Sequence, residues 1–96
     1  MPIPRSFKVF GRTYTVRIED DLLAREDLLG ETNHREQVIR LQAVGAAFPA
    51  DHQEQTFYHE LVHLLFGLVS RDDLRKDEAL VDLLGSMLHQ VFITAS

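Results

Sequence analysis

The pattern that most constrains the fold lies at His59, Glu60 and His63, which read His-Glu-x-x-His within an apolar stretch. On an α-helix, residues four apart lie about 40° apart around the axis and one turn along it. The two imidazoles can therefore reach one metal ion from the same side if this segment is helical. Glu60 lies about 100° from His59, too far round for an obvious ligand but well placed to act on a water at the metal.

The helix that carries this pattern is predicted to begin at Asp51 and to end near Gly67. Asp51 suits the N-cap and Glu54, three residues on, completes a capping-box pattern, while a glycine commonly ends a helix. The apolar residues away from the histidines are expected to face the core: Phe57, Leu61, Leu64, Leu65 and Leu68. The alternative without a metal is a pair of partly exposed helix histidines beside an unrelated glutamate.

A second helix is predicted from about residue 73 or 74 to near residue 92. Its core side is expected to consist of Leu80, Leu83, Leu84, Met87, Leu88 and Val91. Glu78 and Asp82 are four apart and share another face, which Gly85 and His89 extend.

This acidic face can supply a third metal ligand. The chain has no cysteine, so the ligand must be His, Asp or Glu. We interpret Glu78 as the third ligand and Asp82 as the acceptor of a hydrogen bond from a ligating imidazole. Asp82 in place of Glu78 is one alternative. A charged helix start at Glu78 with a solvated face at Asp82 is another.

The first half of the chain is predicted to form strands. Residues 7–10 and 13–18 are expected to form a hairpin through Gly11 and Arg12. Residues 28–32 and 36–41 are expected to form a second hairpin, with a short helical turn or loop over residues 20–27. The predicted fold is α+β: a small antiparallel sheet of three or four strands, followed by two packed helices, in one domain of residues 1–96.

Composition excludes several classes of function. Acidic residues outnumber basic ones by 15 to 10 in a chain of 96, which argues against nucleic-acid binding. No segment reaches the roughly 20 apolar residues of a membrane span, and no signal peptide is evident, so a cytoplasmic protein is expected.

A family resemblance follows from the two helix motifs. His59-Glu-Leu-Val-His63, followed by Glu78-Ala-Leu-Val-Asp82, resembles the gluzincin metallopeptidases, which combine HExxH with a glutamate on a second helix. The short chain is similar to the minigluzincins and to small phage or bacterial proteins related to the ImmA/IrrE peptidase domain. The resemblance covers residues 57–88, whereas residues 1–50 match only in layout.

The resemblance implies a zinc-dependent peptidase acting on a peptide or protein. Zinc is then expected on His59, His63 and Glu78, with Asp82 in support and Glu60 as general base. The chain has no room for the second lobe of larger gluzincins, which supplies groups that stabilise the tetrahedral intermediate, and no such group is evident. The alternative is a non-catalytic zinc-stabilised binding module or an inactive accessory protein on the same fold; an intact Glu60 argues against a purely structural site.

Residues around the motif are candidates for a substrate groove. His52 lies two turns before His59 on nearly the same face, and Tyr58 flanks the motif; an exposed first-turn histidine and a packing tyrosine are the alternatives. His34 is expected at the surface of a hairpin loop. Residues 36–42 are predicted to form the sheet edge along which an extended substrate pairs.

Overall fold

A four-stranded sheet occupies the first half of the protein. The computed structural model describes residues 3–95. The strands are β1 (Ser6–Val9), β2 (Arg12–Glu19), β3 (Gly30–Asn33) and β4 (Val38–Gln42), in the order β1-β2-β4-β3. β1–β2 and β3–β4 are antiparallel hairpins, while β2 and β4 run parallel in the centre. The α+β fold and both hairpins are therefore confirmed, with one parallel pair added.

The edge of the sheet differs from the prediction. Residues 36–42 do not provide it, because β4 lies between β2 and β3. The chain passes through α1 (Leu22–Glu26) and β3 before β4 returns beside β2, which leaves β3 outermost. β3 is thus the edge strand on this side of the sheet.

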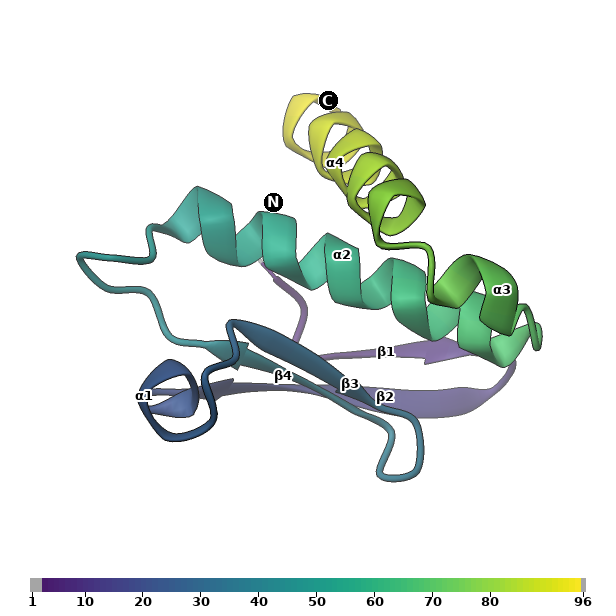
Figure 1. Cartoon of the computed structure of the whole chain (residues 1–96), viewed down its shortest axis with the longest axis horizontal. Coiled ribbons are helices and arrows are strands. Elements are labelled where there is room, and N and C mark those ends of the chain that lie inside the picture. The colour runs from purple at the N-terminus through teal and green to yellow at the C-terminus, as the bar shows by residue number, and fades with distance from the viewer. Residues whose placement is uncertain (1–2, 96) are drawn as a thin grey trace.

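The longest helix, α2 (Ala50–Leu68), lies between the sheet and a second long helix, α4 (Glu78–Thr94) (Figure 1). It therefore buries side chains on two sides. Phe57 clusters with Ile39 and Leu41 of β4, whereas the Tyr58 ring stacks on Phe92 of α4 at a centroid distance of 5.6 Å. A helix packed on two sides needs apolar residues around more of its circumference than one stripe.

The predicted bounds of α2 each lie one residue from the observed ones, but the predicted capping is wrong. The helix begins at Ala50, and the residue before it, Pro49, takes the N-cap position with no side-chain cap. Asp51 is consequently the second helical residue and caps nothing. At the other end the helix continues through Gly67, and the chain turns at Ser70, whose φ of 59° is left-handed.

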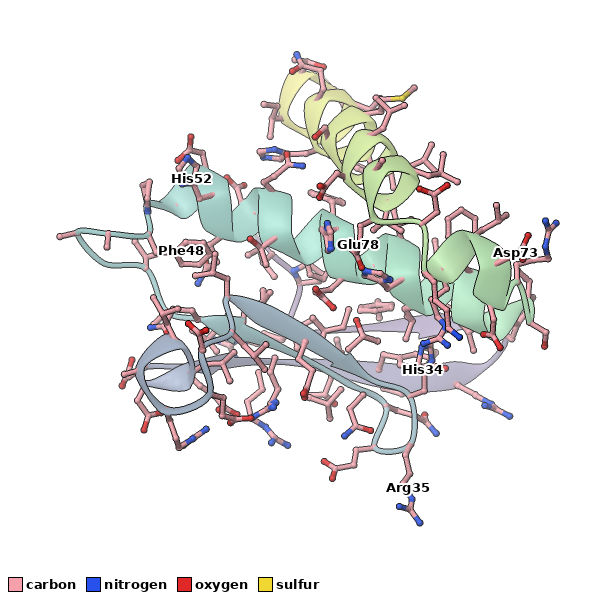
Figure 2. All side chains as sticks on the ribbon, viewed as in Figure 1. His34, Arg35, Phe48, His52, Asp73 and Glu78 are labelled. Carbon is pink, nitrogen blue, oxygen red and sulfur yellow. The ribbon has the colours of Figure 1, made fainter. Side chains whose placement is uncertain are left out.

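The predicted second helix is two helices, α3 (Asp72–Arg75) and α4. The break occurs because the Asp77 side chain accepts a hydrogen bond from the Leu80 N–H at 3.1 Å and so caps a new helix. Glu78 consequently stands at the first position of α4, beside the middle of α2 (Figure 2).

The predicted core side of α4 is confirmed for Leu80, Leu84 and Leu88, which are partly buried, and is wrong for the other three residues. Leu83, Met87 and Val91 are 58%, 56% and 58% exposed, whereas the buried positions are Val81, Gly85 and His89. The reason is Gly85, since a Cβ built there would lie 3.0 Å from the His59 backbone nitrogen. Only the glycine side of α4 can approach the α2 backbone this closely, and this approach also carries Glu78 and Asp82 to the histidines.

Gly85→Val is expected to lower the free energy of unfolding by about 1–3 kcal/mol, because the added methyl groups overpack against α2. The small gain in helix propensity of valine over glycine, about 0.4 kcal/mol, does not offset this. Urea unfolding of the metal-free protein measures the change. Gly45→Ala is the control, because a Cβ there meets nothing within 4 Å and should change stability by less than about 0.5 kcal/mol. Wild-type stability in Gly85→Val would contradict the close crossing.

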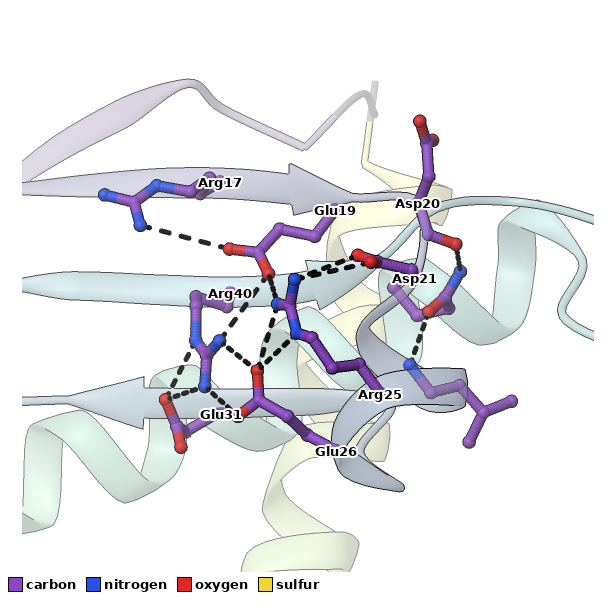
Figure 3. A network of polar contacts seen from close by, with 10 residues as sticks. Arg17, Glu19, Asp20, Asp21, Arg25, Glu26, Glu31 and Arg40 are labelled. Atoms are coloured by element: carbon purple, nitrogen blue, oxygen red, sulfur yellow. Dashed lines mark hydrogen bonds and ion pairs between the residues drawn. The ribbon is translucent and has the colours of Figure 1, made fainter.

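The sheet face away from α2 carries a network of ion pairs (Figure 3). Arg40 of β4 lies 2.8 Å from Glu26 of α1 and 2.6 Å from Glu31 of β3, and Arg25 lies 2.8 Å from Glu19. Arg40 and Arg25 hold the pKa of Glu26 at about 2. The network holds α1 against the sheet, and the charged side chains of this face pair with one another. No helix among the described residues is long and apolar enough to cross a membrane.

Candidate metal centre

Three side chains from two helices meet at the crossing of α2 and α4. The Nε2 atoms of His59 and His63 lie 3.2 Å apart. Glu78 turns one carboxylate oxygen to each, at 3.3 Å from His59 Nε2 and 3.2 Å from His63 Nε2. The histidine side chains are 21% and 15% exposed, and the Glu78 side chain is 65% exposed. The arrangement is therefore partly buried on the α2 side and open on the α4 side.

These distances fit a metal ion. When ligands surround zinc tetrahedrally at about 2.0–2.1 Å, neighbouring donor atoms lie about 3.3 Å apart. The two histidine Nε2 atoms have this separation, each of them faces a different Glu78 oxygen at 3.2–3.3 Å, and one donor atom from each residue lies within 4.8 Å of the others. Two imidazoles and a carboxylate form a donor set that zinc accepts, and three protein ligands leave a further position open.

Asp82 faces the other nitrogen of His59. Its Oδ1 atom lies 2.6 Å from His59 Nδ1. A proton held between these atoms leaves His59 Nε2 unprotonated and directed at the donor cluster, which is the usual arrangement behind a ligating histidine. The geometry thus favours Glu78 over Asp82 as the third ligand.

Glu60 is held from the sheet. The Thr32 hydroxyl of β3 lies 2.8 Å from Glu60 Oε1 and 3.0 Å from the Glu60 carbonyl oxygen. A Cβ built at Gly30 would lie 2.7 Å from the Thr56 methyl and 3.2 Å from Glu60 Cγ. The edge strand therefore approaches α2 closely at Glu60, and Thr32 orients the carboxylate.

The contact of Thr32 with Glu60 was not predicted from the sequence. The register of the β3–β4 hairpin pairs Thr32 with Ile39, which is fully buried under α2. Directly opposed residues of an antiparallel pair point to the same face of the sheet. A correct register would thus have directed Thr32 at the helix, but the sequence fixes the register too loosely to show it.

The two groove candidates do not lie with the cluster. Tyr58 is 4% exposed and packs between His89 and Phe92, so it belongs to the core, and burial raises its pKa. Because Tyr58 lies on the α4 side of α2, the packing alternative holds for it and the groove role does not. His52 is exposed at the start of α2 (Figure 2) and is absent from the hollows that contain His59 among the described residues.

Two hollows of about 390 and 290 Å³ adjoin the donor cluster and share Gly30, His59 and Glu60. The first extends toward Asp82, and the second contains His63, Glu78, His34 and Arg75. A larger apolar hollow of about 520 Å³ lies elsewhere, between the start of α2 and β2. The hollows at the crossing place β3, Glu60 and the three donors around one open surface.

Comparisons with protein-family models, with curated proteins and with solved structures find no match to this chain. Its function is therefore inferred from the geometry of these side chains.

Proposed function

We propose that the protein is a zinc-dependent peptidase of the gluzincin type, with His59, His63 and Glu78 as metal ligands and Glu60 as general base. The observation that carries the proposal is the cluster of His59, His63 and Glu78, in which one donor atom from each residue lies within 4.8 Å of the others, with the Glu60 carboxylate in the same hollow. A purely structural site needs no such carboxylate and is usually closed by four protein ligands.

The chain's own residues divide the chemistry among them. Zinc, when bound, supplies Lewis acidity, which makes water acidic near neutral pH and polarises a carbonyl group. Glu60 accepts the proton of the attacking water and delivers it to the leaving amine. Thr32 holds the Glu60 carboxylate in place through its hydroxyl. Asp82 holds His59 in the tautomer that leaves Nε2 free.

The edge strand β3 offers a binding surface for an extended substrate. Its outer side pairs with no strand among the described residues, and Gly30, Glu31 and Thr32 line the hollow that contains the donor cluster. A peptide that adds to this edge gains backbone hydrogen bonds and passes directly beside Glu60. The substrate is therefore proposed to be a peptide or a flexible protein segment.

The alternative is a zinc-stabilised binding module without activity. It has the same three ligands, and the joining of α2 to α4 by a metal supports it, because a small domain gains stability from such a link. It gives no role to the contact between Thr32 and Glu60. Peptide cleavage separates the two functions.

The test is cleavage by the zinc-loaded and the metal-free protein. The full chain is loaded with zinc, its metal content is measured by mass spectrometry, and it is incubated with a mixed peptide library. One zinc per chain, and products that disappear with a chelator and return with zinc, are expected. A protein that takes up no zinc refutes the proposal. A zinc-loaded protein that cleaves nothing refutes the peptidase and supports the binding module instead.

A further inference from the structure

His34 and Arg75 form a corner beside the donor cluster, one helical turn along α2. His63 and Gly67 are four apart, so Gly67 continues the histidine stripe about 5.4 Å further along the axis. A Cβ built at Gly67 would lie 2.7 Å from His34 Nε2 and 3.4 Å from Arg75 Cδ. The missing side chain of Gly67 thus makes room for His34 from the β3–β4 turn and for Arg75 from α3, which meet above it.

Arg75 has hydrogen-bonding capacity that the protein does not use. Its Nε donates to Asp72 Oδ1 at 3.1 Å. Within residues 3–95, neither Nη1 nor Nη2 donates a hydrogen bond. The Arg75 side chain is 34% exposed. It lines the hollow that contains His59, Glu60 and His63. A guanidinium with two free terminal amines matches the two oxygens of a carboxylate.

Asp72 pairs with the Nε edge of this guanidinium, while the other acidic residues nearby have partners of their own. Glu31 lies in the same hollow but is bound by Arg40 at 2.6 Å, and Glu78 is turned to the two histidines. His34 adds a hydrogen-bond donor, and burial together with the positive charges of Arg75 and His63 lowers its pKa. Both residues also line an adjoining hollow of about 400 Å³ that contains Arg12. The Nη atoms of Arg75 therefore remain able to donate hydrogen bonds to a carboxylate, although Asp72 pairs with Nε.

We infer that Arg75, assisted by His34, binds a carboxylate of the substrate, either an Asp or Glu side chain or the free carboxyl terminus. The inference rests on the proposed peptidase function for the identity of the ligand as a peptide. A strand rises about 3.3 Å per residue, so a carboxylate one or two residues from the reacting bond reaches a corner one helical turn from His63. Arg75 is then a specificity-determining residue, and the substrates are acidic or are cleaved near their ends.

The test measures binding without turnover. The probes are blocked alanine pentapeptides with one Glu at each position in turn, the matched Gln peptides, and alanine pentapeptide with a free carboxyl end. Their dissociation constants are measured by calorimetry on the zinc-loaded Glu60→Gln protein. At least one carboxylate peptide should bind about 10- to 100-fold more tightly than its neutral match. The blocked Glu peptides and the free-ended peptide distinguish the two sources of the carboxylate.

Variants at Arg75 assign the preference to this residue. In the same background, Arg75→Gln should abolish the preference, and Arg75→Lys, which keeps the charge but not the paired donors, should restore part of it. Arg71→Gln is the matched control, because it removes the same charge from an exposed arginine paired with Asp73 outside the hollow. Equal loss in Arg71→Gln, an unchanged preference in Arg75→Gln, or no binding of carboxylate peptides at millimolar concentration would each overturn the inference.

The binding test can fail while the proposed peptidase function stands, and the reverse is also possible. A protein that prefers carboxylate peptides but cleaves none keeps the carboxylate site and loses the enzyme. A protein that cleaves peptides with no preference for a carboxylate keeps the enzyme and loses the site.

Discussion

Replacing Glu78 with alanine is expected to weaken zinc binding by at least about 100-fold. Loss of an outer partner of a metal ligand alone costs about 10- to 100-fold, and Glu78 faces both histidine Nε2 atoms directly. The loss removes one of three donors and the only charged one, which also leaves the positive ion less well neutralised. Competition with a chromophoric chelator measures the affinity of the folded variant.

Two further variants make this result specific. Asp82→Asn should weaken zinc binding by about 10- to 100-fold, because the amide no longer accepts the His59 proton as a carboxylate does. Asp51→Ala removes the same charge as Glu78→Ala from an exposed position at the start of α2 and should leave the affinity unchanged. Wild-type affinity in Glu78→Ala, with a large loss in Asp82→Ala, would make Asp82 the ligand instead.

Glu60→Gln is expected to lower kcat/KM for a cleaved peptide by about 10²- to 10⁴-fold while leaving zinc bound. This range is the usual contribution of a positioned general base. The amide has nearly the same shape and can still contact the Thr32 hydroxyl, but it cannot take a proton from water. Initial rates and metal content, measured on the same preparation, separate the loss of chemistry from the loss of metal.

Thr32→Val provides the companion variant, because it keeps the Glu60 carboxylate but removes the hydroxyl that holds it. Its rate should lie between those of the wild type and Glu60→Gln. A Glu60→Gln protein that cleaves at the wild-type rate would show that another group is the base and would leave Glu60 with a structural role.

The sequence predicted the parts of the fold that depend on local spacing. Residues four apart on a helix must share a face, so His59 with His63 and Glu78 with Asp82 could be paired in advance, and the structure brings the two pairs together. The two hairpins were also predictable from local sequence, because short turns between β-forming runs leave few alternative pairings.

Features that depend on packing between distant segments were not predictable. The side of α4 that faces α2 is centred on Gly85, whereas hydrophobic spacing alone also placed the exposed residues Leu83, Met87 and Val91 in the core. Gly67 resembled a helix end, but its lack of a side chain is needed for His34, which lies 33 positions earlier. The parallel pairing of β2 with β4 moved the edge to β3 and so brought Thr32 to Glu60. Each of these contacts joins residues that are far apart in the sequence, so no periodic pattern along the chain predicts it.

The division of the donors between α2 and α4 has a thermodynamic consequence. An ion held there binds the state in which both helices are docked more tightly than a state in which α4 is detached, because the detached state lacks Glu78, and it stabilises the docked state by about 1.4 kcal/mol for each tenfold difference in affinity. Without the ion, α4 is held to α2 by contacts around Gly85, Tyr58 and Phe92, and its outer apolar side adds nothing. Detachment of this helix is then a local opening that the bound ion opposes. The zinc supply would thus govern how long the chain survives proteolysis as well as whether it can react.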